Sequence, residues 1–328
     1  MLNRRDFEQI QQKTGFNLDL LEKTYHLTRV LNEMQKIEAL SKNLTLKGGT
    51  ALNFLHLDIP RLSIDIDLNF TGSAEREDMK TTRPLIAQLI QMMGGKFGYD
   101  IKEKGSSYII SRHNLQYTTL RNTKDHIKIE INYLDRIPID KIRTKKFPSV
   151  FTDIPIFSVS TYSLEELTAQ KIKACIERTA PRDIFDVSCL SQQNIAMKKT
   201  RKYTAVYYCL IEKDRTTDVV ERIEDYDLEK IHQELRQFIR GNEQFDAEKI
   251  RKSATDFLKQ MLSFTVKEQK FIDTFHKEQK IVPELLFKDK PILAHHPALI
   301  YQLELLKRNK PAHERRKKLY EIRNYEKF

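Results

Sequence analysis

The sequence predicts an α+β fold in which helices pack on a small mixed sheet and a mainly helical domain follows. Short runs that alternate apolar and polar side chains, the pattern of half-buried strands, lie in the first half of the chain. Long helical patterns dominate after residue 155. Glycine and proline are sparse, at 9 and 10 of 328 residues, which agrees with a helical second half.

We expect the sheet domain at residues 1–158 and the helical domain at 159–328, a division that the chain length favours. The N-terminal stretch 6–41 should be helical, with a polar break near 13–17. The apolar stretch 203–211 fits either a helix or a strand. Strands are expected at residues 63–70, 107–111, 115–120 and 126–134.

The segment LKGGTALNFLHLDIPRLSIDIDLNF, residues 46–70, contains the first candidate site. In a strand, Asp65 and Asp67 share one face, so each would raise the pKa of the other unless a cation lay between them. A hard divalent ion such as Mg²⁺ suits these oxygen ligands. The turn Gly48-Gly49-Thr50 leads into a helix whose first N–H groups would face an anion such as phosphate. The alternatives are a simple tight turn and a solvated strand face, but the combination favours a nucleoside triphosphate bound with its metal.

A third carboxylate follows in HIKIEINYL, residues 126–134, where Glu130 alternates with buried isoleucines. Glu130 could face the same metal, or it could belong to the polar outer face of one more half-buried strand. Together the two acidic strands resemble the nucleotidyltransferase active site of the DNA polymerase β superfamily.

Ser163 and Glu166 form a Ser-x-x-Glu capping box, which predicts a helix over 164–178. Lys171 falls on the apolar stripe of this helix, whereas Lys173 falls on the opposite side. A buried lysine needs an anion, and a triphosphate would supply one. The alternative is a lysine whose stem packs while its amine reaches solvent.

The segment APRDIFDVSCL predicts another helix, with Pro181 in its first turn. Asp183 and Asp186, three residues apart, share a face of this helix. Acids in a first turn commonly just complement the helix dipole.

The blocks LKGGTALNF, SIDIDLNF, LEELTAQKIKACIER and PRDIFDV occur in the order and spacing of the AbiEii/AbiGii toxin family, and the chain resembles that family over most of its length. The segment LLFKDKPILAHHPAL near residues 285–299 also looks like the C-terminal part of the family. The resemblance implies a polymerase β-like nucleotidyltransferase domain from an abortive-infection or type IV toxin–antitoxin pair that acts in phage defence. It also implies a cognate antitoxin as partner.

The resemblance further implies roles for single residues. Metal binding would fall to Asp65 and Asp67, with Glu130 as the third candidate. Catalysis would need both of these aspartates together with Lys171 and Asp183, Asp186 being the weaker choice for the last role. Arg182 would either hold a phosphate or pair with one of these acids. Nucleotide binding would involve Gly48, Gly49, Thr50, Ser63, Lys171 and Arg182.

Charge suggests the acceptor. The chain has 57 Lys and Arg against 46 Asp and Glu, a net charge of +11 that favours a polyanionic partner. Residues 298–328 hold nine basic and four acidic side chains, with Tyr301, Tyr320 and Tyr325 between them. Two further basic runs lie at 141–146 and 198–202. Any single run is more often a solvated face, but three favour RNA, and members of the resembled family modify the tRNA 3′ acceptor end.

Other classes are disfavoured by the sequence. It has no GxxxxGK[ST] motif, no Ser/His/Asp pattern, and no apolar run or N-terminal signal that would take it into a membrane, so we expect a cytoplasmic protein. Cys175, Cys189 and Cys209 are too few and too dispersed for a disulfide framework or a zinc site. His295 and His296 are expected to be structural or surface residues.

The sequence therefore predicts a toxin-type, Mg²⁺-dependent nucleotidyltransferase. It would transfer a nucleoside monophosphate from an NTP to RNA, at the tRNA 3′ end, and so block translation. Asp67 or Glu130 would orient or deprotonate the acceptor hydroxyl. The alternatives are the same chemistry on a protein hydroxyl and a non-catalytic RNA-binding module of the same fold.

Overall fold

The computed structural model describes residues 2–212 and 218–308. Its centre is a mixed seven-stranded sheet with the strand order β3-β4-β5-β2-β1-β7-β6. The pairs β2–β5 and β1–β7 are parallel, and the other neighbours are antiparallel. The strands are β1 (Leu44–Lys47), β2 (Asp65–Phe70), β3 (Asp100–Glu103), β4 (Ile110–Thr118), β5 (Lys124–Asn132), β6 (Arg143–Phe147) and β7 (Phe157–Thr161).

The sheet is larger than the sequence predicted. The strands expected at 107–111 and 115–120 form the single strand β4, which alternates between buried and partly exposed residues through Asn114. The polar run Arg112-His113-Asn114 concealed this continuity because asparagine is depleted in strands. Four strands were not predicted: the short β1 and β3, the basic β6, and β7.

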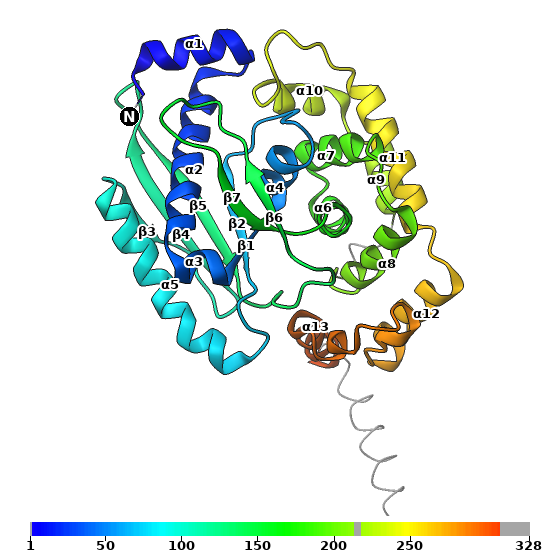
Figure 1. Ribbon diagram of the computed structural model, residues 1–328. Helices are drawn as coiled ribbons and strands as arrows, with labels where there is room; N and C mark the ends of the chain where they lie inside the picture. The colour runs from blue at the N-terminus through cyan, green and yellow to red at the C-terminus, as the bar shows by residue number, and fades with distance from the viewer. Residues whose placement is uncertain (1, 213–217, 309–328) are drawn as a thin grey trace, which may run out of the picture.

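Helices cover both faces of the sheet. The first helices are α1 (Arg4–Thr14), α2 (Leu18–Lys36), α3 (Glu38–Asn43), α4 (Gly48–Leu55) and α5 (Arg76–Lys96). The predicted break near 13–17 is confirmed: Gly15 ends α1 in the left-handed region, and the Asn17 side chain caps α2. Figure 1 shows α2 lying across the sheet, where it contacts β2, β5 and β7.

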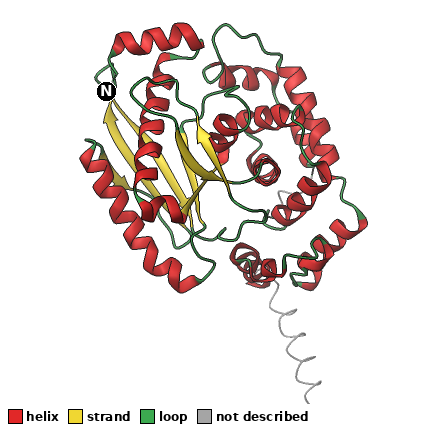
Figure 2. Ribbon diagram, viewed as in Figure 1, coloured by secondary structure: helices red, strands yellow, loops and turns green. Residues whose placement is uncertain are grey.

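The second half is helical, as predicted (Figure 2). Residues 203–208 of the ambiguous stretch belong to helix α8. The helices are α6 (Leu164–Arg178), α7 (Pro181–Ser191), α8 (Met197–Tyr208), α9 (Val219–Glu224), α10 (Leu228–Arg236), α11 (Ala247–Leu262), α12 (Val266–Asp273) and α13 (Pro297–Arg308), with short helical turns at Thr274–Glu278, Pro283–Leu285 and Pro291–His295.

One hydrophobic core joins the two halves. It runs from fully buried strand residues such as Ile66 and Ile129 to Ile172 of α6 and Val187 of α7. The expected boundary at 158 falls inside β7, so the sheet continues to Thr161. The division into two domains therefore stays a prediction. The two halves, which were both expected to contribute residues to the active site, share one continuous core.

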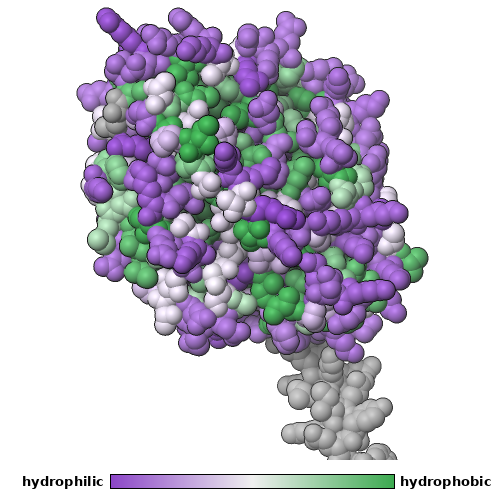
Figure 3. All heavy atoms as spheres, in the orientation of Figure 1, coloured by the Kyte–Doolittle hydropathy of each residue, from purple (hydrophilic) through white to green (hydrophobic). Residues whose placement is uncertain are grey.

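The face shown in Figure 3 is largely hydrophilic, with small groups of hydrophobic side chains. Within the part of the chain that the structure describes, no helix is both long and apolar enough to cross a membrane. All three cysteines carry free thiols.

Candidate active site

A row of charged side chains crosses three neighbouring strands. The register places Lys47 of β1 opposite Asp67 of β2, and Asp67 opposite Glu130 of β5. Residues directly opposite on paired strands share a face, so these three side chains point the same way. All three line a cleft of about 410 Å³. The two acidic strands, β2 and β5, therefore lie side by side, as predicted.

Both halves of the chain build the walls of this cleft. Gly48 and Gly49 contribute the start of α4, and one face of α6, including Lys171 and Arg178, lies across from them. Tyr301 of α13 lines a further wall. Because the strands, α6 and α13 all contribute, the cleft depends on how the helical half packs on the sheet.

The glycine turn opens a helix, as predicted. Helix α4 begins at Gly48, whose φ of +70° lies in the left-handed region that favours glycine. The hydroxyl of Thr50 donates to Ser63 Oγ at 3.0 Å and to the Asp65 carbonyl oxygen at 2.5 Å. Thr50 and Ser63 were predicted to contact the nucleotide, but both side chains are buried. Their hydrogen bonds instead connect the glycine turn to β2.

Substitution of Gly48 tests the turn. A Cβ there would lie 2.4 Å from Asp67 Oδ2, and the positive φ would add strain of about 1–2 kcal/mol. We expect Gly48→Ala to lower the melting temperature and to abolish detectable nucleotide transfer because the Asp67 carboxylate must move. Gly98→Ala is the matched control: Gly98 has a φ of +77° with nothing within 4 Å of an added Cβ. Equal activity losses in the two variants would refute the steric explanation.

Asp67 lies in an unfavourable electrostatic environment. Burial raises the pKa of Asp67, the charges of Asp65 and Glu130 raise it further, and Lys47 and Lys128 lower it. Asp65 lies two residues earlier on the same face, with its Oδ2 3.8 Å from Lys128 Nζ. Glu130 is held by Arg112, whose Nε donates to Oε2 at 2.7 Å. Three carboxylates on neighbouring strands are therefore accompanied by three cations, Lys47, Lys128 and Arg112, and burial still leaves the pKa of Asp67 raised.

This donor set fits a hard cation shared with a ligand. Among residues 2–212 and 218–308, no group of three or more His, Cys, Asp or Glu side chains is arranged to hold a metal by itself. Mg²⁺ is usually bound by one or two carboxylates together with substrate phosphates and waters. Asp67 and Glu130 offer only oxygen ligands to the cleft, which suits an ion shared with substrate phosphates, whereas Asp65 is not among the residues that line the cleft and lies beside Lys128.

Lys171 points inward, as predicted, and its side chain is only 6% exposed. The alternative in which its amine reaches solvent is therefore wrong. Its Nζ lies 3.0 Å from Asp183 Oδ1 and 2.8 Å from Asp186 Oδ2. The expected anion was a triphosphate, but in this structure two buried aspartates already balance the charge of Lys171.

The helix that carries Lys171 begins as predicted, but its capping box is half formed. Ser163 Oγ accepts from the Glu166 backbone N–H. The Glu166 carboxylate instead accepts from the N–H groups of Ile139 and Asp140. Burial raises the pKa of Glu166 to about 8, against the effect of these hydrogen bonds. Glu166 thus fixes the loop after β5 onto α6.

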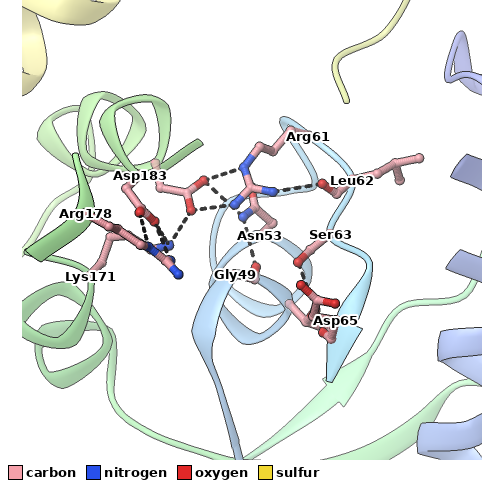
Figure 4. A network of polar contacts seen from close by, with 11 residues as sticks. Gly49, Asn53, Arg61, Leu62, Ser63, Asp65, Lys171, Arg178 and Asp183 are labelled. Carbon is pink, nitrogen blue, oxygen red and sulfur yellow. Dashed lines mark hydrogen bonds and ion pairs between the residues drawn. The ribbon is translucent and has the colours of Figure 1, made fainter. Parts of the chain in front are cut away.

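Arg61, which the sequence analysis missed, completes a buried ionic network (Figure 4). Its Nε and Nη2 donate to the two oxygens of Asp186 at 2.8 and 2.7 Å. Asn53 Nδ2 donates to Asp186 Oδ1 at 3.2 Å and to the Gly49 carbonyl at 2.9 Å. Asp186 of α7 is therefore connected to the glycine turn. A signal existed in the sequence, because Lys171 alone cannot neutralise two buried aspartates.

Asp183 is buried beside the cleft rather than open to it. Burial raises its pKa, but Lys171 and Arg178 outweigh burial and hold this pKa well below the usual range. Arg178 bonds Asp183 from a side chain that is 63% exposed and that also lines the cleft. Arg182, predicted to hold phosphate or pair with an acid, lies with its guanidinium 5.0 Å from the Phe238 ring centroid. Instead, Arg61 pairs with Asp186 and Arg178 pairs with Asp183.

The remaining predicted features lie around the cleft. His296 is buried and structural, with Nε2 3.2 Å from Asp135 Oδ1, so it ties the start of α13 to the cleft wall. The basic runs at 141–146 and 198–202 are partly neutralised: Lys199 pairs with Asp140, and Arg201 with Glu268. The C-terminal basic run beyond residue 308 lies outside the described residues.

The fold, helices on a mixed seven-stranded sheet, is consistent with the polymerase β-like α+β class. Residues 29–276 match the family model of the AbiEii nucleotidyl transferase toxins of type IV toxin–antitoxin systems, and the chain belongs to this family. An NTP substrate and an antitoxin partner follow from that membership. No curated protein sequence matches the chain.

Three solved structures align with this chain, and the first of them shares its fold. MenT4, a nucleotidyltransferase toxin from Mycobacterium tuberculosis H37Rv, aligns with a TM-score of 0.63 at 12% identity over 93% of this chain and 99% of its own. A putative nucleotidyltransferase from H. pylori gives 0.44 at 18% identity over 71% and 94%. JHP933 from Helicobacter pylori gives 0.41 at 19% identity over 77% and 98%.

Proposed function

We propose that this nucleotidyltransferase transfers a nucleoside monophosphate to RNA, at the 3′ acceptor end of tRNA, and so blocks translation. The observation that carries the proposal is the meeting of Gly48, Asp67 and Glu130 in one cleft. The start of a helix favours phosphate, and adjacent carboxylates favour a divalent ion. The two together suit a triphosphate whose α-phosphorus lies beside the acids.

The chemistry requires an acceptor oxygen to bond to the α-phosphorus as the bond to the bridging oxygen of pyrophosphate breaks. The N–H groups at the start of α4 would hold the triphosphate, and the exposed Arg178 would stabilise the departing pyrophosphate. Lys171 is paired with two buried aspartates, so its part would be to hold the wall of the cleft in place. Asp65 and Asp67, with Glu130 as a third ligand, would hold Mg²⁺, which when bound neutralises phosphate charge. Glu130 or Asp67 would take the hydroxyl proton.

An RNA acceptor is supported by charge and by the family resemblance. The chain carries a net charge of +11, and Arg178, with an exposed side chain, opens on the cleft. Tyr301 adds an aromatic ring to the cleft wall, where a base could stack. The 3′ end of tRNA is the acceptor that the resemblance implies.

The test incubates purified protein and total tRNA with each of the four α-³²P-labelled NTPs, with Mg²⁺ or with EDTA. We expect label on tRNA from at least one NTP, loss of label in EDTA, and recovery on adding excess Mg²⁺. Periodate treatment of the tRNA, which destroys the terminal ribose diol, should prevent labelling. Label on protein alone would support a protein acceptor instead, and no label would support a non-catalytic RNA-binding module.

A further inference from the structure

A second hollow of about 570 Å³ adjoins the active-site cleft and shares Leu134 and Tyr301 with it as walls. We call it the side groove. Its remaining walls come from residues 74–76 at the start of α5, Tyr108 in the loop before β4, residues 136–137 after β5, and the segment 292–304. None of the chemistry assigned above uses the residues that line only this groove.

Tyr108 presents a fixed aromatic ring to the side groove. The residue is 52% exposed, yet its hydroxyl accepts a hydrogen bond from Arg76 Nε at 2.8 Å, and the Arg76 guanidinium lies 5.5 Å from the ring centroid. Arg83 holds the backbone beneath the ring by donating to the Ser107 carbonyl at 2.6 Å and to that of Tyr108. An exposed aromatic ring held in this way suits stacking against a flat ligand.

Two arginines and two glutamates line the groove, so it offers both a cation for a phosphate and acceptors for a base. Arg76 is exposed at the rim, and the buried guanidinium of Arg136 donates to the carbonyls of Ala74 and Tyr133 beneath it. The facing acids, Glu75 and Glu304, are exposed at the rim. Arginine is the preferred partner of phosphate, and carboxylates accept hydrogen bonds from the exocyclic amines of bases.

We propose that the side groove binds the single-stranded end of the acceptor RNA, with a base stacked on Tyr108 and a backbone phosphate at Arg76. The inference rests on the proposed function and deepens it. The groove and the cleft share Leu134 and Tyr301 as walls, so a strand that passes Tyr301 would lead its terminal hydroxyl toward Asp67 and Glu130. Tyr108 and Arg76 would fix the path of the RNA strand by stacking and by a phosphate contact, neither of which requires a particular base sequence.

The test measures binding of a fluorescent, short single-stranded oligoribonucleotide to the full chain without NTP, so that it is independent of turnover. We expect Tyr108→Ala to raise the Kd about tenfold and Tyr108→Phe to retain most affinity. Arg76→Ala should reduce the slope of log Kd against log salt by about one. The matched controls are Arg121→Ala, 66% exposed, and Ile156→Ala, 64% exposed, which lie outside the groove and should change neither quantity.

The outcomes separate this inference from the proposed function. A higher KM for RNA with unchanged NTP binding in Tyr108→Ala would support the groove. An unchanged Kd in Tyr108→Ala at an unchanged melting temperature would overturn it, as would loss of antitoxin binding with RNA binding intact. If no RNA is labelled but Tyr108→Ala still weakens oligonucleotide binding, the groove stands and the transfer reaction does not.

Discussion

Replacing Asp67 with asparagine is expected to lower kcat/KM for nucleotide transfer by about a thousandfold or more while the fold stays intact. Asp67 lies in the middle of the charged row, opposite both Lys47 and Glu130. Asparagine keeps the size of the side chain but removes the charge that a divalent ion would need. The nucleotide would then be bound without the ion, and the negative charge of the departing pyrophosphate would not be neutralised.

The same substitution is expected to raise the stability of the metal-free protein. Burial raises the pKa of Asp67 above its ordinary value. An acid whose pKa is raised on folding stabilises the folded state below its unfolded pKa, and this contribution is lost as the pH rises through the folded value. The ionised carboxylate therefore costs stability at neutral pH, and Asp67→Asn removes that cost.

Two measurements check this prediction. Radiolabel transfer should fall in Asp67→Asn but not in Asp100→Asn, whose aspartate is 63% exposed on β3. Calorimetry in EDTA should give a higher melting temperature for Asp67→Asn at pH 7, with a smaller gain at pH 4. A variant that loses stability at pH 7, or that keeps wild-type transfer, would show that Asp67 has been given the wrong role.

The sequence predicted the features that depend only on neighbouring residues, namely helix starts and the faces of strands. Ser163 and Pro181 mark the starts of α6 and α7 because capping and a fixed φ act within one turn. The alternation around Asp67 and Glu130 predicted that both acids share a face with the site, since strand periodicity needs no tertiary information.

Long-range pairing could not be predicted from the sequence. A buried lysine at 171 implied an anion, but Arg61 and Asp186, 125 residues apart, meet only after the helical half packs on the sheet. The edge strand β6, RTKKF, contains three basic residues and is stabilised by its pairing with β7 rather than by its own pattern. The sequence therefore located the acids and the glycine turn but not the network behind them.

Replacing Asp186 with asparagine is expected to lower the free energy of unfolding by about 3–5 kcal/mol. The reason is that Arg61, 3% exposed, would keep only the Leu62 carbonyl of its present partners. Lys171, 6% exposed, would keep only Asp183. Opposing burial, Arg61 and Lys171 hold the pKa of Asp186 below its ordinary value. An acid whose pKa is lowered on folding stabilises the folded state above its unfolded pKa, near 4. This stabilisation is lost as the pH falls further. The difference between wild type and Asp186→Asn should thus persist from pH 7 down to about pH 4 and shrink below it. A loss under about 1 kcal/mol at pH 7 in urea titrations would contradict this account.

A double variant separates charge balance from positioning. Replacing Arg61 and Asp186 together with leucine removes one cation and one anion, so Lys171 and Arg178 keep Asp183 as their partner and most of the lost stability should return. The double variant still lacks the carboxylate that holds Asn53 against the Gly49 carbonyl. We therefore expect recovered stability but weakened NTP binding, because the glycine turn has lost its brace to α7. Recovery of both properties would mean that the network serves stability alone.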